Sequence, residues 1–352
     1  MPRFLAPLLL ALLPTLAAAD ESIRVYNWND YIAPQVLKDF EQQTGIRVDY
    51  RTYTSAEELL KVIDSGEAVD VVVPSHNNLP ELIRAGKLQP LDLARLPNRK
   101  HLDPQLMSKL AGVDPDNRYA VPYLWGAVGL AVNGPQAEKA FGGPLPNSWA
   151  VLFDPAHSKR LSSCGMSVLD APDEALSVLM TYQGRSLART APSRLKRSAE
   201  VLAGLRPNLR YIDSERYIED LNKGHLCVAM AWVGDALNAA AAGQPVRFVV
   251  PDEGSVLFID NLVIPKSANR ADLAHRFIDF LMQPEVAARI TSETLYPNGN
   301  VDSRQFLEPS LRDQPGLYPD KETKRRLFAL EPLPEKLGAT RDEIWTAFRD
   351  GR

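Results

Sequence analysis

Short apolar strands alternate with amphipathic helices between residues 23 and 85, and this alternation restricts the fold more than any other feature. Residues 23–27, 46–53 and 70–73 have the apolar, β-branched content of strands, and residues 34–44 carry apolar side chains at helical spacing. Ser55, with Glu58 three residues later, predicts the capped start of a further helix. Strands and helices in strict alternation predict an α/β fold with a mostly parallel sheet.

A second alternating block follows Asn133 and suggests a second lobe. Its predicted strand and helix segments are 167–169, 201–205, 227–232, 247–250, 258–264 and 272–282, with a last helix at 340–348. The chain has 352 residues, enough for two lobes with separate cores. Ligands of parallel sheets bind beyond the carboxyl ends of the strands, where Trp28 and Ser75 are expected to lie.

Aromatic residues stand close to carboxylates at several places along the chain. Trp28 is near Asp30, Trp232 near Asp235 and Phe258 near Asp260, and Glu174 and Tyr296 are further candidates. Aromatic faces attract cations, and carboxylates accept charge-assisted hydrogen bonds from ammonium groups. If the fold gathers these segments, the cleft suits a small organic cation with an apolar body.

Each of these residues also has a purely structural interpretation. Trp28 and Trp232 can be core residues, Glu174 can sit in the first turn of a helix after Pro172, and Asp235 can cap a helix. Asp260 is harder to explain in this way. It lies in an apolar strand with no basic residue within five positions, and a buried carboxylate needs a partner.

The start of the chain predicts export. Arg3, an apolar run over residues 4–13 and three alanines at 17–19 match a signal peptide cleaved after Ala19. In an oxidising compartment Cys164 and Cys227 can form one disulfide, with two buried free thiols as the alternative. Cleavage removes Arg3 and leaves 39 basic and 44 acidic residues, a formal charge of −5 with no basic run, which argues against nucleic acid as a partner.

Enzyme signatures are mostly missing from the sequence. No P-loop, G-x-S-x-G or H-E-x-x-H motif occurs, and the five histidines show no metal-ligand spacing, although His76 lies beside Ser75. Ser193 and Lys196 match S-x-x-K by spacing alone. We therefore expect no catalytic residue, metal or cofactor. A secreted hydrolase that uses two of the carboxylates is the alternative from a different class.

Many segments in order carry a resemblance that covers essentially the whole mature chain. They include VYNWNDYIAP, FEQQTGI, DVVVPS, DPDNRYAVPYLWGAVGLAVN, SCGMSVLDAP, YIEDL, AMAWVGD and PGLYP. The sequence resembles the periplasmic polyamine-binding proteins of ABC importers, and within them the putrescine-binding branch. The resemblance implies a type II periplasmic-binding fold of two lobes, each a mixed, mostly parallel sheet flanked by helices. The implied boundaries are 20–131 with 259–300 for lobe 1, and 132–258 with 301–352 for lobe 2.

The resemblance also implies a set of ligand-binding residues and a disulfide between Cys164 and Cys227. The ligand set is Trp28, Asn29, Asp30, Ser75, Glu174, Trp232, Asp235, Phe258, Asp260 and Tyr296. It implies hinge crossings near Val132, Phe258 and Asn300, a periplasmic monomer and a membrane permease as partner. An alternative role is polyamine sensing, in which the protein signals to a membrane receptor.

Ligand choice stays open among putrescine, cadaverine, agmatine and spermidine. The residues at Asp30, Ala171, Asp235 and Phe258 resemble the putrescine-binding branch rather than the spermidine-binding one. Asn29, Asn77 and Asn78 depart from the putrescine pattern, and extra amides with one aromatic fewer could admit a longer or more polar diamine.

Overall fold

The computed structural model describes residues 21–351, so the predicted signal peptide at residues 1–19 lies outside the described part. The strands are β1 Ser22–Trp28, β2 Arg47–Tyr53, β3 Val71–Val72, β4 Ala120–Asn133, β5 Met166–Val168, β6 Tyr211–Ile212, β7 Val228–Trp232, β8 Val246–Val249, β9 Ser255–Val263 and β10 Leu327–Ala329. Within this range no helix is long and apolar enough to span a membrane.

Helices cover the sheet on both sides. The α-helices are α1 Pro34–Thr44, α2 Ala56–Asp64, α3 Leu79–Arg84, α4 Pro104–Leu110, α5 Gly134–Phe141, α6 Ala150–Phe153, α7 Pro155–Leu161, α8 Pro172–Tyr182, α9 Pro192–Ser198, α10 Glu200–Leu205, α11 Arg216–Asn222, α12 Val233–Ala241, α13 Ala271–Leu281, α14 Pro284–Thr294, α15 Pro309–Arg312, α16 Lys321–Arg326 and α17 Glu335–Asp350. Short 3₁₀ turns are η1 His76–Asn78, η2 Leu93–Arg95, η3 Pro97–His101, η4 Pro115–Asn117, η5 Arg206–Asn208 and η6 Val301–Phe306.

The predicted α/β fold with mixed, mostly parallel sheets is confirmed. The strand order is β2-β1-β3-β9-β4-β7-β5-β6, with β10 beside β9 and β8 beside β4. Strand β1 runs parallel to β2 and β3, and β5 runs parallel to β6 and β7. The antiparallel members are β4 and β9, which pair with each other between the two parallel sets.

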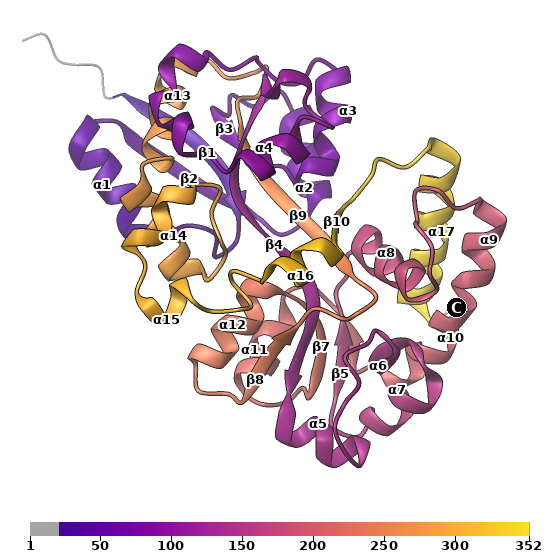
Figure 1. Cartoon of the computed structure of the whole chain (residues 1–352). Coiled ribbons are helices and arrows are strands. Elements are labelled where there is room, and N and C mark those ends of the chain that lie inside the picture. Colours follow the sequence, from indigo (N-terminus) through magenta and orange to yellow (C-terminus); the bar gives the residue numbers. More distant parts are fainter. Residues whose placement is uncertain (1–20, 352) are drawn as a thin grey trace, which may run out of the picture.

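Strands β4 and β9 pass through both halves of the molecule (Figure 1). The β4 residues up to Ala127 pair with β9, and those from Val128 onward pair with β7. Val121 packs in a hydrophobic cluster with α1, α13 and α14, whereas Val128 packs in another with α8 and α12. The hydrophobic cluster against which the strand packs thus changes within β4, which makes β4 and β9 two of the connections between the halves.

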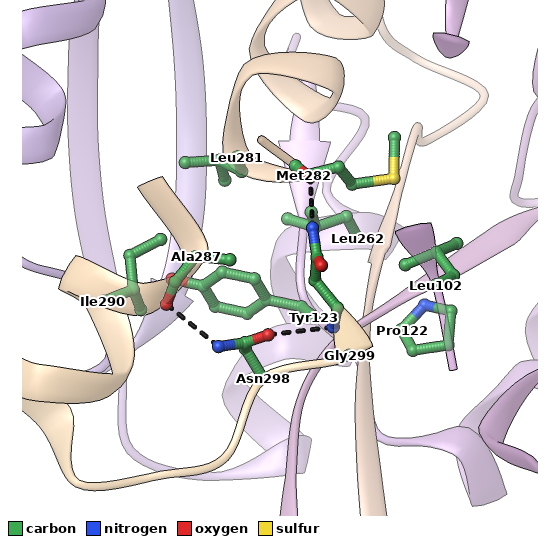
Figure 2. Close-up of a pocket in the computed structure, with 11 residues that line it drawn as sticks. Leu102, Pro122, Tyr123, Leu262, Leu281, Met282, Ala287, Ile290, Asn298 and Gly299 are labelled. Carbon is green, nitrogen blue, oxygen red and sulfur yellow. Dashed lines mark hydrogen bonds between the residues drawn. The ribbon is translucent and has the colours of Figure 1, made fainter. Parts of the chain in front are cut away.

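A segment after α14 runs beside β4 and is fixed by asparagine side chains (Figure 2). The amide of Asn298 donates to the Ala287 carbonyl at 3.0 Å, and its oxygen accepts from the Asn300 N–H at 2.8 Å. The Asn300 amide in turn donates to the Met282 carbonyl at 2.7 Å. Only a gap of about 10 Å³ remains among these side chains. The segment that carries Tyr296 is therefore tied firmly to the ends of α13 and α14.

Cys164 and Cys227 are bonded, as predicted, and link the end of α7 to the start of β7. The two cysteines are 63 positions apart in the sequence, so their disulfide closes a long loop. Replacing both by serine is expected to lower the free energy of unfolding by about 4 kcal/mol, because the loop restricts the unfolded chain. Urea unfolding of the oxidised protein and the double serine variant measures this. Equal midpoints with equal slopes would contradict it.

Candidate functional site

All ten predicted site residues line one cleft between the two halves. Its volume is about 520 Å³, within the range of roughly 300–1,000 Å³ that is usual for small-molecule sites. The lining residues predicted from the sequence are Trp28, Asn29, Asp30, Ser75, Glu174, Trp232, Asp235, Phe258, Asp260 and Tyr296. Residues up to 268 positions apart in sequence thus meet in one place.

Strand ends from both halves bring these side chains together. Trp28 ends β1 and Ser75 follows β3, while Glu174 lies just beyond β5 and Trp232 ends β7. Parallel strands put their carboxyl ends at the same edge, and the two sets face each other across the cleft. The crossing strand β9 contributes Phe258 and Asp260.

Asp260 is 4% exposed, and its charge is held by hydroxyl groups rather than by a base. The Tyr31 hydroxyl donates to Oδ2 at 2.6 Å and the Ser75 hydroxyl donates to Oδ1. Tyr31 is itself fixed, because its carbonyl accepts from the Tyr123 hydroxyl at 2.7 Å. Burial raises the pKa of Asp260 to about 6, and the two hydroxyl donors partly offset the rise.

Asp235 has a similar environment on the opposite side of the cleft. The Tyr296 hydroxyl donates to Oδ1 at 2.9 Å, and the Tyr217 hydroxyl donates to Oδ2. Burial raises the pKa of Asp235 to about 6, again against the effect of these donors. For both aspartates the hydroxyl donors favour the ionised form, but they offset only part of the effect of burial.

Glu174 lies in the first turn of α8, which is the structural role that its position after Pro172 predicted. It also lines the cleft. Burial, followed by the nearby charge of Asp173, raises the pKa of Glu174 to about 7. Asp30 is exposed at the cleft, with a left-handed φ of 51° in the turn after β1.

The four acids share one property, which is that no basic side chain neutralises them. Within residues 21–351, no salt bridge forms to Asp30, Glu174, Asp235 or Asp260. Uncompensated carboxylates in a partly dry cleft are costly, and an entering cation removes that cost. The arrangement therefore favours a ligand with more than one positive charge.

Aromatic rings form the walls between the acids. Trp28 meets Tyr53 edge to face at 4.7 Å, and Trp232 meets Tyr217 at 6.5 Å between ring centroids. The Tyr296 ring lies between Tyr31, at 5.0 Å, and Phe258, at 6.0 Å. Trp28 and Trp232 are only half-buried, so they are wall residues as well as packing residues. Apolar faces between separated charges suit a flexible methylene chain.

One structural alternative from the sequence is wrong. Helix α12 begins at Val233, so Asp235 lies inside its first turn and does not cap it. Ser75 lies directly before η1, and its hydroxyl donates to Asp260 on the neighbouring strand.

Sequence reasoning missed two of the three tyrosines that hold the two aspartates, namely Tyr31 and Tyr217. Tyr31 follows Asp30 directly in the strand-to-helix junction, so its position was a usable signal. Tyr217 lies 18 positions before Asp235 on α11 and carried no such signal. Further lining residues that were not predicted are Tyr31, Ile32, Pro34, Tyr53, Thr54, Ser214, Glu215, Ile218, Asn222, Asn238, Glu293 and Thr294.

Several residues noted in the sequence lie outside this cleft lining. His76 is buried and accepts from the Ile259 N–H at 3.3 Å, and burial lowers its pKa to about 4. Asn77 and Asn78 belong to η1 and are absent from the lining set, whereas Asn29 is part of it. Across residues 21–351 no group of three or more His, Cys, Asp or Glu side chains could hold a metal ion.

A cleft between two α/β halves, lined by unpaired acids and aromatic walls, defines a protein that binds a small solute. Residues 35–316 match the family described as bacterial extracellular solute-binding protein. The chain belongs to this family, which makes it a solute-binding protein and not an enzyme.

Known relatives agree with the resemblance seen in the sequence. The chain is 37% identical to a putrescine-binding periplasmic protein of Escherichia coli K12, over 96% of this chain and 94% of the relative. It is 40% identical to a putrescine/agmatine-binding protein of Pseudomonas aeruginosa PAO1, over 95% and 93%. A solved spermidine/putrescine ABC transporter chain from Listeria monocytogenes superposes with a TM-score of 0.85 and 30% identity, over 94% of this chain and 100% of that one. The predicted family, fold and periplasmic location are thereby confirmed.

Proposed function

We propose that this protein captures a small linear polyamine, putrescine first among them, and delivers it to the permease of an ABC importer. The observation that carries the proposal is a set of four carboxylates between aromatic walls, none of which forms a salt bridge within the part of the chain that the structure describes. The similarity to putrescine-binding, putrescine/agmatine-binding and spermidine/putrescine transport proteins supports the choice of ligand and of transport system.

In this proposal the ammonium groups bind the carboxylates, and the methylene chain lies against the rings. Asp260 and Asp235 face the cleft from opposite sides, each held by two hydroxyl donors. Those hydroxyls keep the carboxylates oriented before the ligand arrives, which lowers the cost of ordering the site. The ten lining residues predicted from the sequence are the proposed ligand-binding residues.

The two halves are the proposed lobes, and they close on the ligand about strands β4 and β9. The predicted lobes are 20–131 with 259–300 and 132–258 with 301–352. The change of packing between Ala127 and Val128 supports a hinge a few residues before Val132. Leu317 packs in the hydrophobic cluster that contains Val121, and Leu337 packs in the one that contains Val128. This difference supports a third crossing between the halves, at a position later than Asn300.

Calorimetric titration of refolded, ligand-stripped protein tests the function directly. Putrescine, cadaverine, agmatine and spermidine are titrated in turn, and unfolding beforehand removes any amine retained from the cell. Tight one-to-one binding of at least one of them is expected. Absence of binding to all four would reject a polyamine ligand while leaving the family assignment intact.

The hydroxyl of Tyr31 should strengthen binding although it is not among the predicted ligand residues. Tyr31→Phe removes the donor to Asp260, which then favours its protonated form more strongly. We expect the dissociation constant for putrescine to rise roughly 10- to 100-fold, the usual effect of losing a hydrogen bond to a charged group. Tyr318→Phe is the matched control, because that buried hydroxyl has no hydrogen-bond partner in the described structure. Equal effects of both variants would contradict the role of Tyr31.

A further inference from the structure

The ring of Tyr296 lies directly on a backbone position that has no side chain. A Cβ atom at Gly234 would lie 2.5 Å from Cζ of Tyr296 and closer still to Cδ2 and Cε2 of the same ring. Real Cβ atoms essentially never approach other heavy atoms this closely. The contact joins the two halves, because Gly234 is in α12 and Tyr296 follows α14.

The ring has little room to move away. Tyr31 and Phe258 flank it at centroid distances of 5.0 and 6.0 Å, and its hydroxyl is bonded to Asp235 at 2.9 Å. Its backbone is held by the asparagine-fixed segment that begins two residues later. A side chain at position 234 would therefore have to push the two halves apart or break the bond to Asp235.

The backbone of Gly234 does not need glycine for its own conformation. It lies in the first turn of α12 and has no positive φ angle. Alanine is the better helix former by about 0.8–1 kcal/mol in a helix interior. The backbone of α12 therefore does not require glycine at this position, and the close approach of Tyr296 is the feature that glycine permits.

We propose that Gly234 is a positioning residue for lobe closure, because its missing side chain lets the Tyr296 ring seat against α12 and complete the cleft. A second contact at the same edge fits this role, since the Asn238 amide of α12 donates to the Thr294 carbonyl at 3.3 Å. The inference rests on the proposed function in one respect, namely that closure of the lobes holds a ligand.

The Gly234→Ala variant separates closure from folding. The proposal implies that opening of the lobes separates Gly234 from the Tyr296 ring, so the melting temperature without ligand should stay equal or rise. The dissociation constant for putrescine should rise on the order of 10- to 100-fold, because the closed form is overpacked. Gly338→Ala is the matched control, since this helical glycine of α17 has nothing within 4 Å of an added Cβ. Unchanged affinity in Gly234→Ala would overturn the inference.

A double-mutant cycle tests whether the Tyr296 ring is the obstacle. In a Tyr296→Ala background, which itself binds weakly, adding Gly234→Ala should change the dissociation constant less than threefold. An undiminished effect of Gly234→Ala in that background would assign the loss to α12 itself and overturn the inference.

A ligand-free measurement distinguishes failure of this inference from failure of the proposed function. Cysteines introduced by Asn238→Cys and Glu293→Cys stand on opposite halves at the same edge, where a short bismaleimide can link them. Adding Gly234→Ala should slow linking several-fold, and adding Gly338→Ala should not. Equal rates, or no linking in the parent double-cysteine protein, would overturn the inference whether or not any polyamine binds.

Discussion

Putrescine binding is expected to weaken by ~10,000-fold when the pH falls from 8 to 5, because three buried carboxylates must ionise to hold the ligand. Burial raises the pKa of Glu174 to about 7 and the pKa values of Asp235 and Asp260 to about 6. A bound ammonium lowers each pKa, so binding releases protons. Affinity is therefore fully present well above these free-state values and is lost as the pH falls through them, about tenfold per unit for each group.

Calorimetry across this pH range, in buffers of different ionisation enthalpy, measures both affinity and the number of protons released. Glu174→Gln should remove the decline that begins near pH 7 and leave the decline near pH 6. A constant affinity from pH 8 to 5 would contradict the role of all three groups.

Ligand-free stability should respond to pH in the opposite direction. The folded-state pKa values of Glu174, Asp235 and Asp260 lie above their ordinary values, so protonation stabilises the folded form more than the unfolded one. The contribution of these three groups to the free energy of unfolding should rise as the pH falls from about 8 towards 4. Comparing the melting temperatures of the wild type and Glu174→Gln over that range isolates the part of this contribution that comes from Glu174.

Asp260→Asn is expected to weaken putrescine binding by about 2–4 kcal/mol, or roughly 30- to 1,000-fold. Asp260 is 4% exposed, and an ammonium group left beside a neutral amide there has lost its water without gaining a counter-charge. The variant should fold normally, because the amide fills the same space and removes a buried charge.

The matched control is Asp64→Asn, which makes the same chemical change at an exposed aspartate paired with Lys87 on the surface. Its affinity should equal that of the wild type, so a general effect of net charge is excluded. Wild-type affinity in Asp260→Asn, with Asp64→Asn also unchanged, would remove Asp260 from the binding site.

Local elements were predictable wherever spacing and capping act within a few residues. The helix expected at residues 34–44 has those bounds in α1, and the Ser55 oxygen accepts from the Glu58 N–H at 3.2 Å as the capping pattern required. The strand expected at 70–73 is shorter in the structure, because Asp70 accepts from the Arg24 N–H with its side chain and Pro74 has no N–H. The last helix starts earlier than predicted, at Glu335.

The sequence by itself determined the alternating α/β pattern and the places where acids stand beside aromatic rings, because both are visible along one chain, and its family resemblance implied the disulfide and the full set of cleft residues. Only the tertiary structure decided how those acids are held. Tyr31 and Asp260 are 229 positions apart, and Tyr296 and Asp235 are 61 apart, so no local pattern joins them. The contact between Tyr296 and Gly234 likewise forms only where the two halves meet. The absence of a side chain at position 234 matters only because the ring that packs there comes from the other half.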